Sequence, residues 1–276
     1  MENILQIDFE DWYYCLDFTQ WNNYEDRINY QSEKLLSILN EFNAKATFFV
    51  VGHLAEKYPS LVKEIIKNDH EIGTHGYMHK ELTKQTPEEF KSDLLKSIRI
   101  LEDITGDKIW GFRACKFTLV KKTSWAVKIL KEAGLKYDSS IFPFKTHQYG
   151  VPDAPRYPYT ISSDNILSAK SDDDFLEFPL SVYKLPVIGM NLPVAGGLYL
   201  RALPFSFINH ALNKINKQGY PAVCYLHPWE LDPDHPREKQ YPFYHYYNLK
   251  NTEKKFRKLL TNFKFISTKT WMLKYL

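Results

Sequence analysis

Apolar and polar positions along the 276-residue chain follow two alternating patterns. Short, continuous apolar runs are typical of buried strands, and they occupy residues 3–9, 45–52, 70–76 and 109–115. Longer stretches with apolar residues every three or four positions predict helices, and they occupy residues 32–43, 58–69 and 86–106. Residues 123–140 and 204–230 each combine a helix, a glycine and a strand. This alternation predicts a mostly parallel sheet covered by helices, because helical crossovers join parallel strands.

About seven such strands can close into a (β/α) barrel, in which active residues lie at the C-terminal ends of the strands. We therefore expect one α/β domain over residues 1–276. Residues 141–203 interrupt the rhythm and are rich in proline and glycine. This segment is predicted to be an insertion of loops and short strands over the barrel mouth.

Composition and charge narrow the classes of function. The net charge is +3 and the charges are well mixed, so the sequence predicts no nucleic-acid partner. No apolar run approaches the roughly 18 residues of a membrane span. The N-terminus lacks the pattern of a signal peptide, so a cytoplasmic protein is expected. Three scattered cysteines argue against a disulfide framework. The sequence is compatible with a homo-oligomer and does not decide the oligomeric state.

Unusual polar residues follow the predicted strands. Buried acids and imidazoles are costly unless they are paired or bound to metal. The strand ends carry the following residues: Asp8, Glu10 and Asp11; His75 and, four residues later, His79; Arg113; Asp138; His227 and Glu230. Because parallel strands end at one rim, these side chains are expected to share a site.

The histidine pair His75 and His79 predicts a metal site. Two neutral imidazoles and one carboxylate are a common ligand set for Zn²⁺ and similar divalent ions, with a position left for water. A helical turn after His75 would place both rings on one side. An isolated pair at this spacing is more often a solvent-exposed turn, but a strand before His75 and an acid cluster on another strand favour metal. His70, at the start of the same strand, is interpreted as structural.

The three acids of the first strand end must fill two roles, metal ligand and proton acceptor. Asp8 and Glu10 share a face by strand alternation, whereas Asp11 lies where the chain leaves the strand. One of the three is expected to be only a cap or an ion-pair partner. Arg113 can orient the base carboxylate, and His227 can protonate a leaving group. Structural ion pairs are the alternative for both.

These motifs, in their order along the chain, resemble the polysaccharide deacetylase family, also called the NodB-homology or carbohydrate esterase 4 family. The resemblance spans roughly residues 3–275 and rests on "DFED", "HGYMH", "GFRAC", "YDSS" and "LHPWE". It is strongest to a subgroup from bacterial exopolysaccharide gene clusters, to which segments such as "GGLYLR" and "LHPWELDPDHPRE" are similar.

The resemblance implies a deformed (β/α) barrel that hydrolyses the N-acetyl group of an N-acetylhexosamine. His75 and His79 would be metal ligands, with an acid of "DFED" as the third, another as the base, and His227 as the acid. Either Asp8 is the base and Glu10 the ligand, or Glu10 is the base and Asp11 the ligand. Asp8 is favoured as the base because Asp8 and Glu10 share one strand face.

The sequence departs from the family pattern at two positions. Trp12 stands where the first motif usually has glycine, and Cys115 stands where the third usually has proline. The second departure bears on the loop that carries Arg113.

Aromatic and cationic residues of the late loops are candidates for substrate binding. Aromatic rings can stack on sugar faces, and arginines can contact anionic or hydroxyl groups. The candidates are Tyr149, Tyr199, Trp229, Arg156 and Arg201. The expected partner is an N-acetylated glycan or sugar intermediate. The alternatives are an amidohydrolase acting on a small cyclic amide and a non-catalytic glycan-binding barrel.

Overall fold

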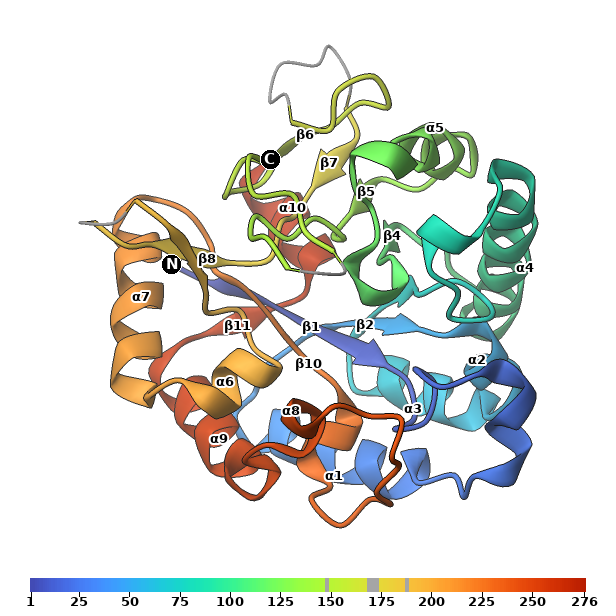
Figure 1. Cartoon of the computed structure of the whole chain (residues 1–276), viewed down its shortest axis with the longest axis horizontal. Coiled ribbons are helices and arrows are strands. Elements are labelled where there is room, and N and C mark those ends of the chain that lie inside the picture. The colour runs from blue at the N-terminus through green and yellow to red at the C-terminus, as the bar shows by residue number, and fades with distance from the viewer. Residues whose placement is uncertain (147–148, 168–173, 187–188) are drawn as a thin grey trace.

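The computed structural model describes residues 1–146, 149–167, 174–186 and 189–276. It shows a curled sheet with helices around its outer side (Figure 1). Within the described residues, the main sheet has nine strands in the order β10-β1-β2-β3-β4-β5-β7-β6, and β11 also pairs with β1. They are β1 (Asn3–Phe9), β2 (Thr47–Val50), β3 (Glu71–Thr74), β4 (Gly111–Phe112), β5 (Tyr137–Asp138), β6 (Tyr159–Thr160), β7 (Leu176–Glu177), β10 (Val223–Leu226) and β11 (Phe265–Ile266). Every pairing except β6 with β7 is parallel, as the alternating pattern predicts.

Helices connect the parallel strands and bury their apolar faces against the sheet. The α-helices are α1 (Ile28–Glu41), α2 (Gly52–Lys57), α3 (Pro59–Lys67), α4 (Pro87–Thr105), α5 (Trp125–Glu132), α6 (Leu198–Ala202), α7 (Phe205–Lys217), α8 (Phe243–Tyr246), α9 (Thr252–Asn262) and α10 (Thr268–Tyr275). Short 3₁₀ helices are η1 (Phe18–Asn23), η2 (Leu82–Lys84), η3 (Cys115–Phe117), η4 (Lys121–Thr123), η5 (Pro228–Leu231) and η6 (Leu249–Asn251). In the described residues, no helix combines the length and the apolar character that crossing a bilayer requires.

Local sequence signals explain where α4 begins and ends. The Thr86 side chain accepts from the Glu89 N–H, and the Glu89 carboxylate accepts from the Thr86 N–H. This reciprocal capping satisfies two of the free donors at the helix start. Gly106 ends the helix in a left-handed conformation that favours glycine.

Strand β1 lies inside the sheet, between β10 and β2, and is buried along its whole length. Its residues 4–7 pair with β10, residues 3–4 pair with β11, and residues 6–9 pair with β2. Burial on both faces explains the nearly continuous apolar run, as expected for a central parallel strand. The polar residues that interrupt or follow this run therefore need partners.

Residues 141–203 do more than cover the barrel mouth. Strand β7 joins the main sheet beside β5, while β8 (Val182–Lys184) and β9 (Asn191–Pro193) form a separate hairpin. Ser181 donates its N–H to the Val223 carbonyl at 3.2 Å, and its hydroxyl accepts from the Val223 N–H at 2.8 Å. The segment thus bridges the open side of the curled sheet to β10.

The same closure requires glycine at position 196. Gly196 forms a parallel bridge with Tyr225 and has φ of 139°. A Cβ atom there would lie 1.8 Å from the Tyr225 carbonyl oxygen. Only glycine allows the two backbones to approach this closely.

Candidate active site

Asp8 and Glu10 lie at the C-terminal end of β1, on one face of the strand. Both are almost fully buried. They line a cavity of about 330 Å³ together with His75, His79 and His227. The structure thus brings residues from the first, third and tenth strands to one place, as the strand-end argument predicts for a parallel sheet.

His75 and His79 present the same nitrogen to this cavity. Nδ1 of His75 lies 2.7 Å from the Arg113 carbonyl oxygen, and Nδ1 of His79 lies 3.0 Å from the Tyr14 carbonyl oxygen. A carbonyl can only accept, so each Nδ1 carries a hydrogen, and Nε2 is the atom with a free lone pair whenever the ring is neutral. Backbone carbonyls in this position commonly orient metal-binding histidines. Burial lowers the pKa of His75 to about 4, which keeps its ring neutral.

Glu10 completes a set of three candidate ligands. One atom each from Glu10, His75 and His79 lies within 4.8 Å of the others. Oε2 of Glu10 is 2.6 Å from Nε2 of His79, yet among the described residues this oxygen has no hydrogen-bond partner of standard geometry. Two nitrogens and one carboxylate oxygen converging in this way suit Zn²⁺ or a similar divalent cation. The residues present therefore fit a metal.

The charge balance of the cluster also favours an ionised Glu10. Burial alone would raise the pKa of this carboxyl, but the neighbouring charge and hydrogen bond of His79 lower it to about 2. In the opposite direction, burial would lower the pKa of His79, but Cys115 and Glu10 raise it well above its usual value. These opposite pKa shifts favour an ionised Glu10 next to a protonated His79.

Asp11 is not brought to the cluster. Its Oδ1 accepts from the Trp12 N–H at 2.8 Å, and its Oδ2 accepts from the N–H groups of Arg27 and Ile28 at 2.8 and 2.9 Å. Asp11 thus satisfies free donors at the start of α1, a position where a negative charge is also favourable. Of the three acids in "DFED", Asp11 has the capping role that the sequence assigned to one member.

Arg113 follows β4 and is fully buried beneath Asp8. Its Nη1 lies 3.2 Å from Asp8 Oδ1, and its Nη2 donates to the side chains of Gln6 and Ser139. The guanidinium also lies over the ring of Phe49, with 4.8 Å between Cζ and the ring centroid. These contacts fix the Asp8 carboxylate in one orientation. Cys115 does not displace Arg113 from this position.

His227 follows β10 and faces the two acids across the cavity. Its Nε2 lies 3.8 Å from Asp8 Oδ2 and 3.7 Å from Glu10 Oε1. Its Nδ1 lies 2.9 Å from Glu230 Oε1. Burial would lower the pKa of His227, but the hydrogen bond and charge of Glu230 raise it. The imidazole is therefore held in one orientation and favours its protonated form.

Arg201 lines the same cavity, but its guanidinium is engaged with Glu230 and backbone carbonyls, so it supports this histidine indirectly. Its Nε donates to Glu230 Oε2 at 2.9 Å, and its Nη1 donates to the carbonyls of His245 and Tyr247 at 2.8 and 2.7 Å. Burial would raise the pKa of Glu230, but the charge of Arg201 and the bond to His227 lower it. A buried network of charged groups thus runs from Arg201 through Glu230 to His227.

The other predicted glycan contacts separate into two groups. Tyr149, Tyr199 and Trp229 line the same cavity as the acids and histidines, whereas Arg156 lines a different pocket. The Trp229 ring stacks on His227 with centroids 5.0 Å apart. The structure therefore forms an aromatic wall beside the metal-ligand cluster without Arg156.

Sequence reasoning missed several residues that line the cavity, among them Lys116 and Tyr241. Lys116 lies in η3 with φ of 50° and forms an ion pair with Glu81 at 3.0 Å. Tyr241 donates its hydroxyl to the Trp12 carbonyl at 2.5 Å. The aromatic run "YPFYHYY" at 241–247, shortly after "LHPWE", was the available signal for the second.

Family comparisons divide the chain into two segments. Residues 18–137 match the polysaccharide deacetylase family, and residues 139–273 match a domain of unknown function. The first segment holds His75, His79 and Arg113. Asp8 precedes it, and His227 lies in the second segment. The clustered site therefore draws on both matched segments and on the residues before them.

Similar proteins match over part of their length. A peptidoglycan-N-acetylglucosamine deacetylase of Bacillus cereus is 41% identical over 73 residues, which are 26% of this chain and 26% of that protein. A peptidoglycan deacetylase of Helicobacter pylori is 32% identical over 108 residues, 39% of this chain and 36% of that protein. This chain thus covers much less than two thirds of the length of either relative.

Solved structures confirm the predicted deformed barrel. A Mycobacterium smegmatis protein assigned to the polysaccharide deacetylases has a TM-score of 0.56 at 23% identity, covering 83% of this chain and 78% of that one. The Bc1960 peptidoglycan N-acetylglucosamine deacetylase has a TM-score of 0.50 at 19% identity, covering 98% of this chain and 86% of that one. At these identities the likeness concerns the fold.

Proposed function

Because residues 18–137 match the polysaccharide deacetylase family, we propose that this chain is a metal-dependent hydrolase that removes the acetyl group from an N-acetylhexosamine. The proposed substrate is a bacterial polysaccharide, such as an exopolysaccharide, or its glycan precursor. The observation that carries this proposal is the convergence of Glu10, His75 and His79 beside Asp8 and His227 in one cavity.

Glu10, His75 and His79 would hold the cation, with Zn²⁺ as the expected ion. When bound, such a cation polarises an amide carbonyl and lowers the pKa of a bound water. The two Nδ1–H groups stay engaged with backbone carbonyls, so both Nε2 atoms remain available.

Asp8 is the proposed general base. Its carboxylate accepts the proton of the attacking water while the oxygen forms a bond to the acetamide carbon. The ion pair with Arg113 holds the carboxylate toward the cavity. A positioned base of this kind contributes about 10²–10⁴-fold to the rate.

His227 is the proposed general acid. As the carbon–nitrogen bond breaks, its Nε2 delivers a proton to the nitrogen of the departing amine. Glu230 holds Nδ1 and raises the pKa of the ring, so the proton is present at the start of the reaction. The products are acetate and a free amino sugar, and the atoms balance with one water consumed.

The aromatic wall of Tyr149, Tyr199 and Trp229 supports a sugar as the group presented to these residues. Flat aromatic faces pack well against the C–H faces of sugar rings. The rings lie on the same cavity as Asp8 and His227, so a stacked sugar could bring its acetamide to both.

The test measures bound metal and acetate release together. Wild type should bind a stoichiometric divalent ion and release acetate from N-acetylated oligosaccharides, and a chelator should abolish the release. His75→Ala and His79→Ala should lose both the metal and the activity, whereas the exposed His210→Ala control should keep both.

Unchanged turnover in the two histidine variants would overturn the role of the metal. Glycan binding without acetate release would identify a non-catalytic glycan-binding barrel. Hydrolysis of small cyclic amides, with none of the glycans, would favour the other amidohydrolase activity.

A further inference from the structure

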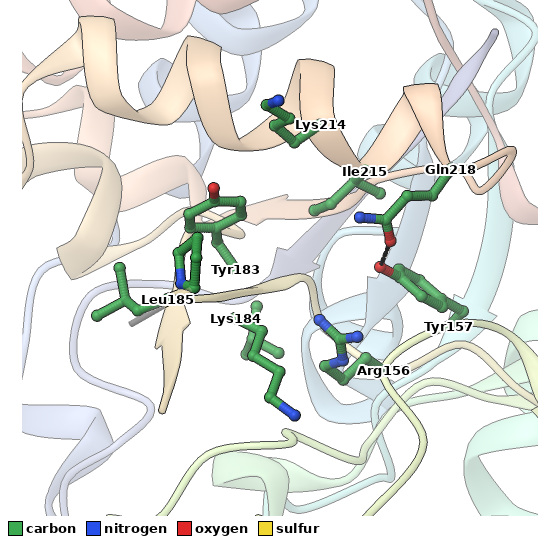
Figure 2. Close-up of a pocket in the computed structure, with 10 residues that line it drawn as sticks. Arg156, Tyr157, Tyr183, Lys184, Leu185, Lys214, Ile215 and Gln218 are labelled. Carbon is green, nitrogen blue, oxygen red and sulfur yellow. Dashed lines mark hydrogen bonds between the residues drawn. The ribbon is translucent and has the colours of Figure 1, made fainter. Parts of the chain in front are cut away.

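A second cavity, of about 370 Å³, lies between the loop of Arg156, strand β8 and helix α7. Figure 2 shows Arg156 and Lys184 on facing segments, with Lys214 on the helix that lines the cavity. The residues around this cavity differ from those around the metal-ligand cluster. Its size is within the range of pockets that hold small ligands.

The lining of this cavity carries positive charge without matching acids. Arg156, Lys184 and Lys214 line it, and no aspartate or glutamate does. Among the described residues, no carboxylate is within 4.0 Å of the charged groups of these three side chains. Elsewhere, buried or half-buried cations such as Arg201 and Lys116 are paired. Three cations that line one cavity without acids create a local field that attracts anions, although the Lys184 and Lys214 side chains point to different sides of it (Figure 2).

Two tyrosines add fixed aromatic surface to the same cavity. The Tyr157 ring stacks on Tyr220 with centroids 3.9 Å apart, and its hydroxyl donates to the side chain of Gln218 (Figure 2). The Tyr183 ring packs edge-on against Phe207, with centroids 5.9 Å apart. Rings held in this way lose little freedom when a ligand packs against them.

The combination of cations and tyrosines selects one class of ligand. Bare inorganic anions need no aromatic surface, and neutral sugars need no cations. We propose that the Arg156–Lys184–Lys214 pocket binds a glycan segment that carries a carboxylate or a phosphate group. The guanidinium of Arg156 would pair with the anionic group through parallel N–H donors. The Tyr157 ring is stacked on Tyr220, and its centroid lies 5.2 Å from Cζ of Arg156, so it would hold that arginine in place. Tyr183 would contact the sugar rings.

This pocket adds an anchoring point to the proposed deacetylase and does not depend on that activity. Binding can be measured without turnover, so failure of the deacetylase proposal would leave the result intact. An anchor for charged residues of a polymer would hold the chain on the protein while other residues reach the metal-ligand cluster.

The experiment compares a pocket variant with a charge-matched control. The triple variant Arg156→Ala/Lys184→Ala/Lys214→Ala removes the three cations. The control Lys63→Ala/Lys67→Ala/Lys128→Ala removes the same charge from exposed positions on α3 and α5. The probes are tetragalacturonate for the carboxylate, glucose 1-phosphate for the phosphate, and chitotetraose as the neutral sugar, each titrated by calorimetry.

Wild type and the control should bind at least one anionic probe, with an affinity that falls as salt rises. The pocket variant should bind it at least about tenfold more weakly, because several charge-assisted bonds are lost. Tetragalacturonate binding alone assigns the carboxylate, and glucose 1-phosphate binding alone assigns the phosphate. Equal affinity in the pocket variant, stronger binding of chitotetraose, or no binding of either anion would overturn the proposal.

A single substitution guards against a folding defect in the triple variant. Lys184 is exposed at the end of β8, so Lys184→Glu should leave the melting temperature unchanged. It should weaken binding of the same anion by a similar factor, because a repulsive charge replaces an attractive one. Unchanged binding in this folded variant would also overturn the proposal.

Discussion

The strands before residue 139 and the segment 141–203 contribute to the same cavity in different ways. The earlier strands supply ionisable side chains from strand ends, such as Asp8 and His75, whose positions follow from the parallel register. The later segment supplies aromatic rings and closes the sheet through isolated contacts, such as Gly196 against Tyr225. The reactive side chains and the residues that enclose the cavity therefore come from different parts of the fold. Each can therefore be disturbed with little direct effect on the other.

The largest effect is expected from a change in the chemistry alone. Asp8→Asn keeps the shape of the side chain but cannot accept the proton, so kcat should fall about 10²–10⁴-fold. The metal content should change little, whereas the melting temperature should fall because the buried Arg113 loses its ion-pair partner. Steady-state acetate release, calorimetric unfolding and metal analysis measure the three quantities.

Asp11→Asn is the matched control for that variant, because Asp11 caps α1 outside the cavity. Its amide nitrogen cannot accept an N–H, so stability should fall by about 1–3 kcal/mol, while the metal and most of kcat should be kept. A loss of metal in Asp11→Asn, with metal kept in Glu10→Gln, would reverse the assignment of the third ligand.

The next effect is expected where the later region touches the chemistry. Arg201→Met removes the arginine partner of the buried Glu230, which keeps only His227, and removes donors to the carbonyls of His245 and Tyr247. We expect a loss of about 3–5 kcal/mol in the free energy of unfolding. Arg257→Met, which breaks ion pairs of a partly exposed arginine, should cost only about 0–1 kcal/mol. If urea unfolding gave equal losses of unfolding free energy for both variants, the Arg201–Glu230 ion pair would contribute no more than an exposed one.

A smaller effect is expected from the closure itself. Gly196→Ala forces a Cβ against the Tyr225 carbonyl, so the segment must shift, at a cost of about 1–3 kcal/mol. Gly219→Ala has φ of 87° and open space around it, and should cost only about 1 kcal/mol. If closure positions the aromatic wall, Gly196→Ala should also raise KM more than Gly219→Ala does. Identical KM values for the two variants would show that the contact between Gly196 and Tyr225 does not affect substrate binding.

The smallest effect concerns the end of the sheet opposite the site. His70 accepts from the Ala46 N–H at 3.2 Å, and burial lowers its pKa to about 4 from an ordinary 6.5. The folded state therefore binds fewer protons than the unfolded state between these values. The stability from His70 is present above pH 6.5 and is lost as the pH falls toward 4.

His70→Asn keeps an acceptor but does not titrate, so the metal-free variant should lose less stability than wild type between pH 6.5 and 4. The difference should be at most about 1.4 kcal/mol per pH unit, the limit for one proton. Urea unfolding at several pH values measures it. A parallel pH dependence in both proteins would contradict the buried, neutral state of His70.

Sequence reasoning succeeded where chemistry and structure are encoded within a few residues. The strand before Asp8 and the spacing of His75 and His79 were sufficient to place these side chains at one rim. The choice between Glu10 and Asp11 was not, because it depends on how the chain turns after β1 toward the start of α1.

The arginines of the late loops show a second limit. Arg156 and Arg201 occur in similar proline-, glycine- and aromatic-rich contexts, yet one lines a separate pocket and the other is buried against Glu230. Glu230, the partner of Arg201, lies 29 residues away in the sequence, so the local pattern carries no information about it. The sheet contribution of β7 was missed for the same reason, because its two residues gain strand character only from pairing with β5 and β6.

Arg113 joins three strands through a single guanidinium, since Asp8 and Gln6 belong to β1, Arg113 itself follows β4, and Ser139 follows β5. The spacing across this part of the sheet is therefore mechanically coupled to the orientation of the Asp8 carboxylate. Substitutions that widen the barrel, however far from the cavity, should change the alignment of the base before they unfold the protein.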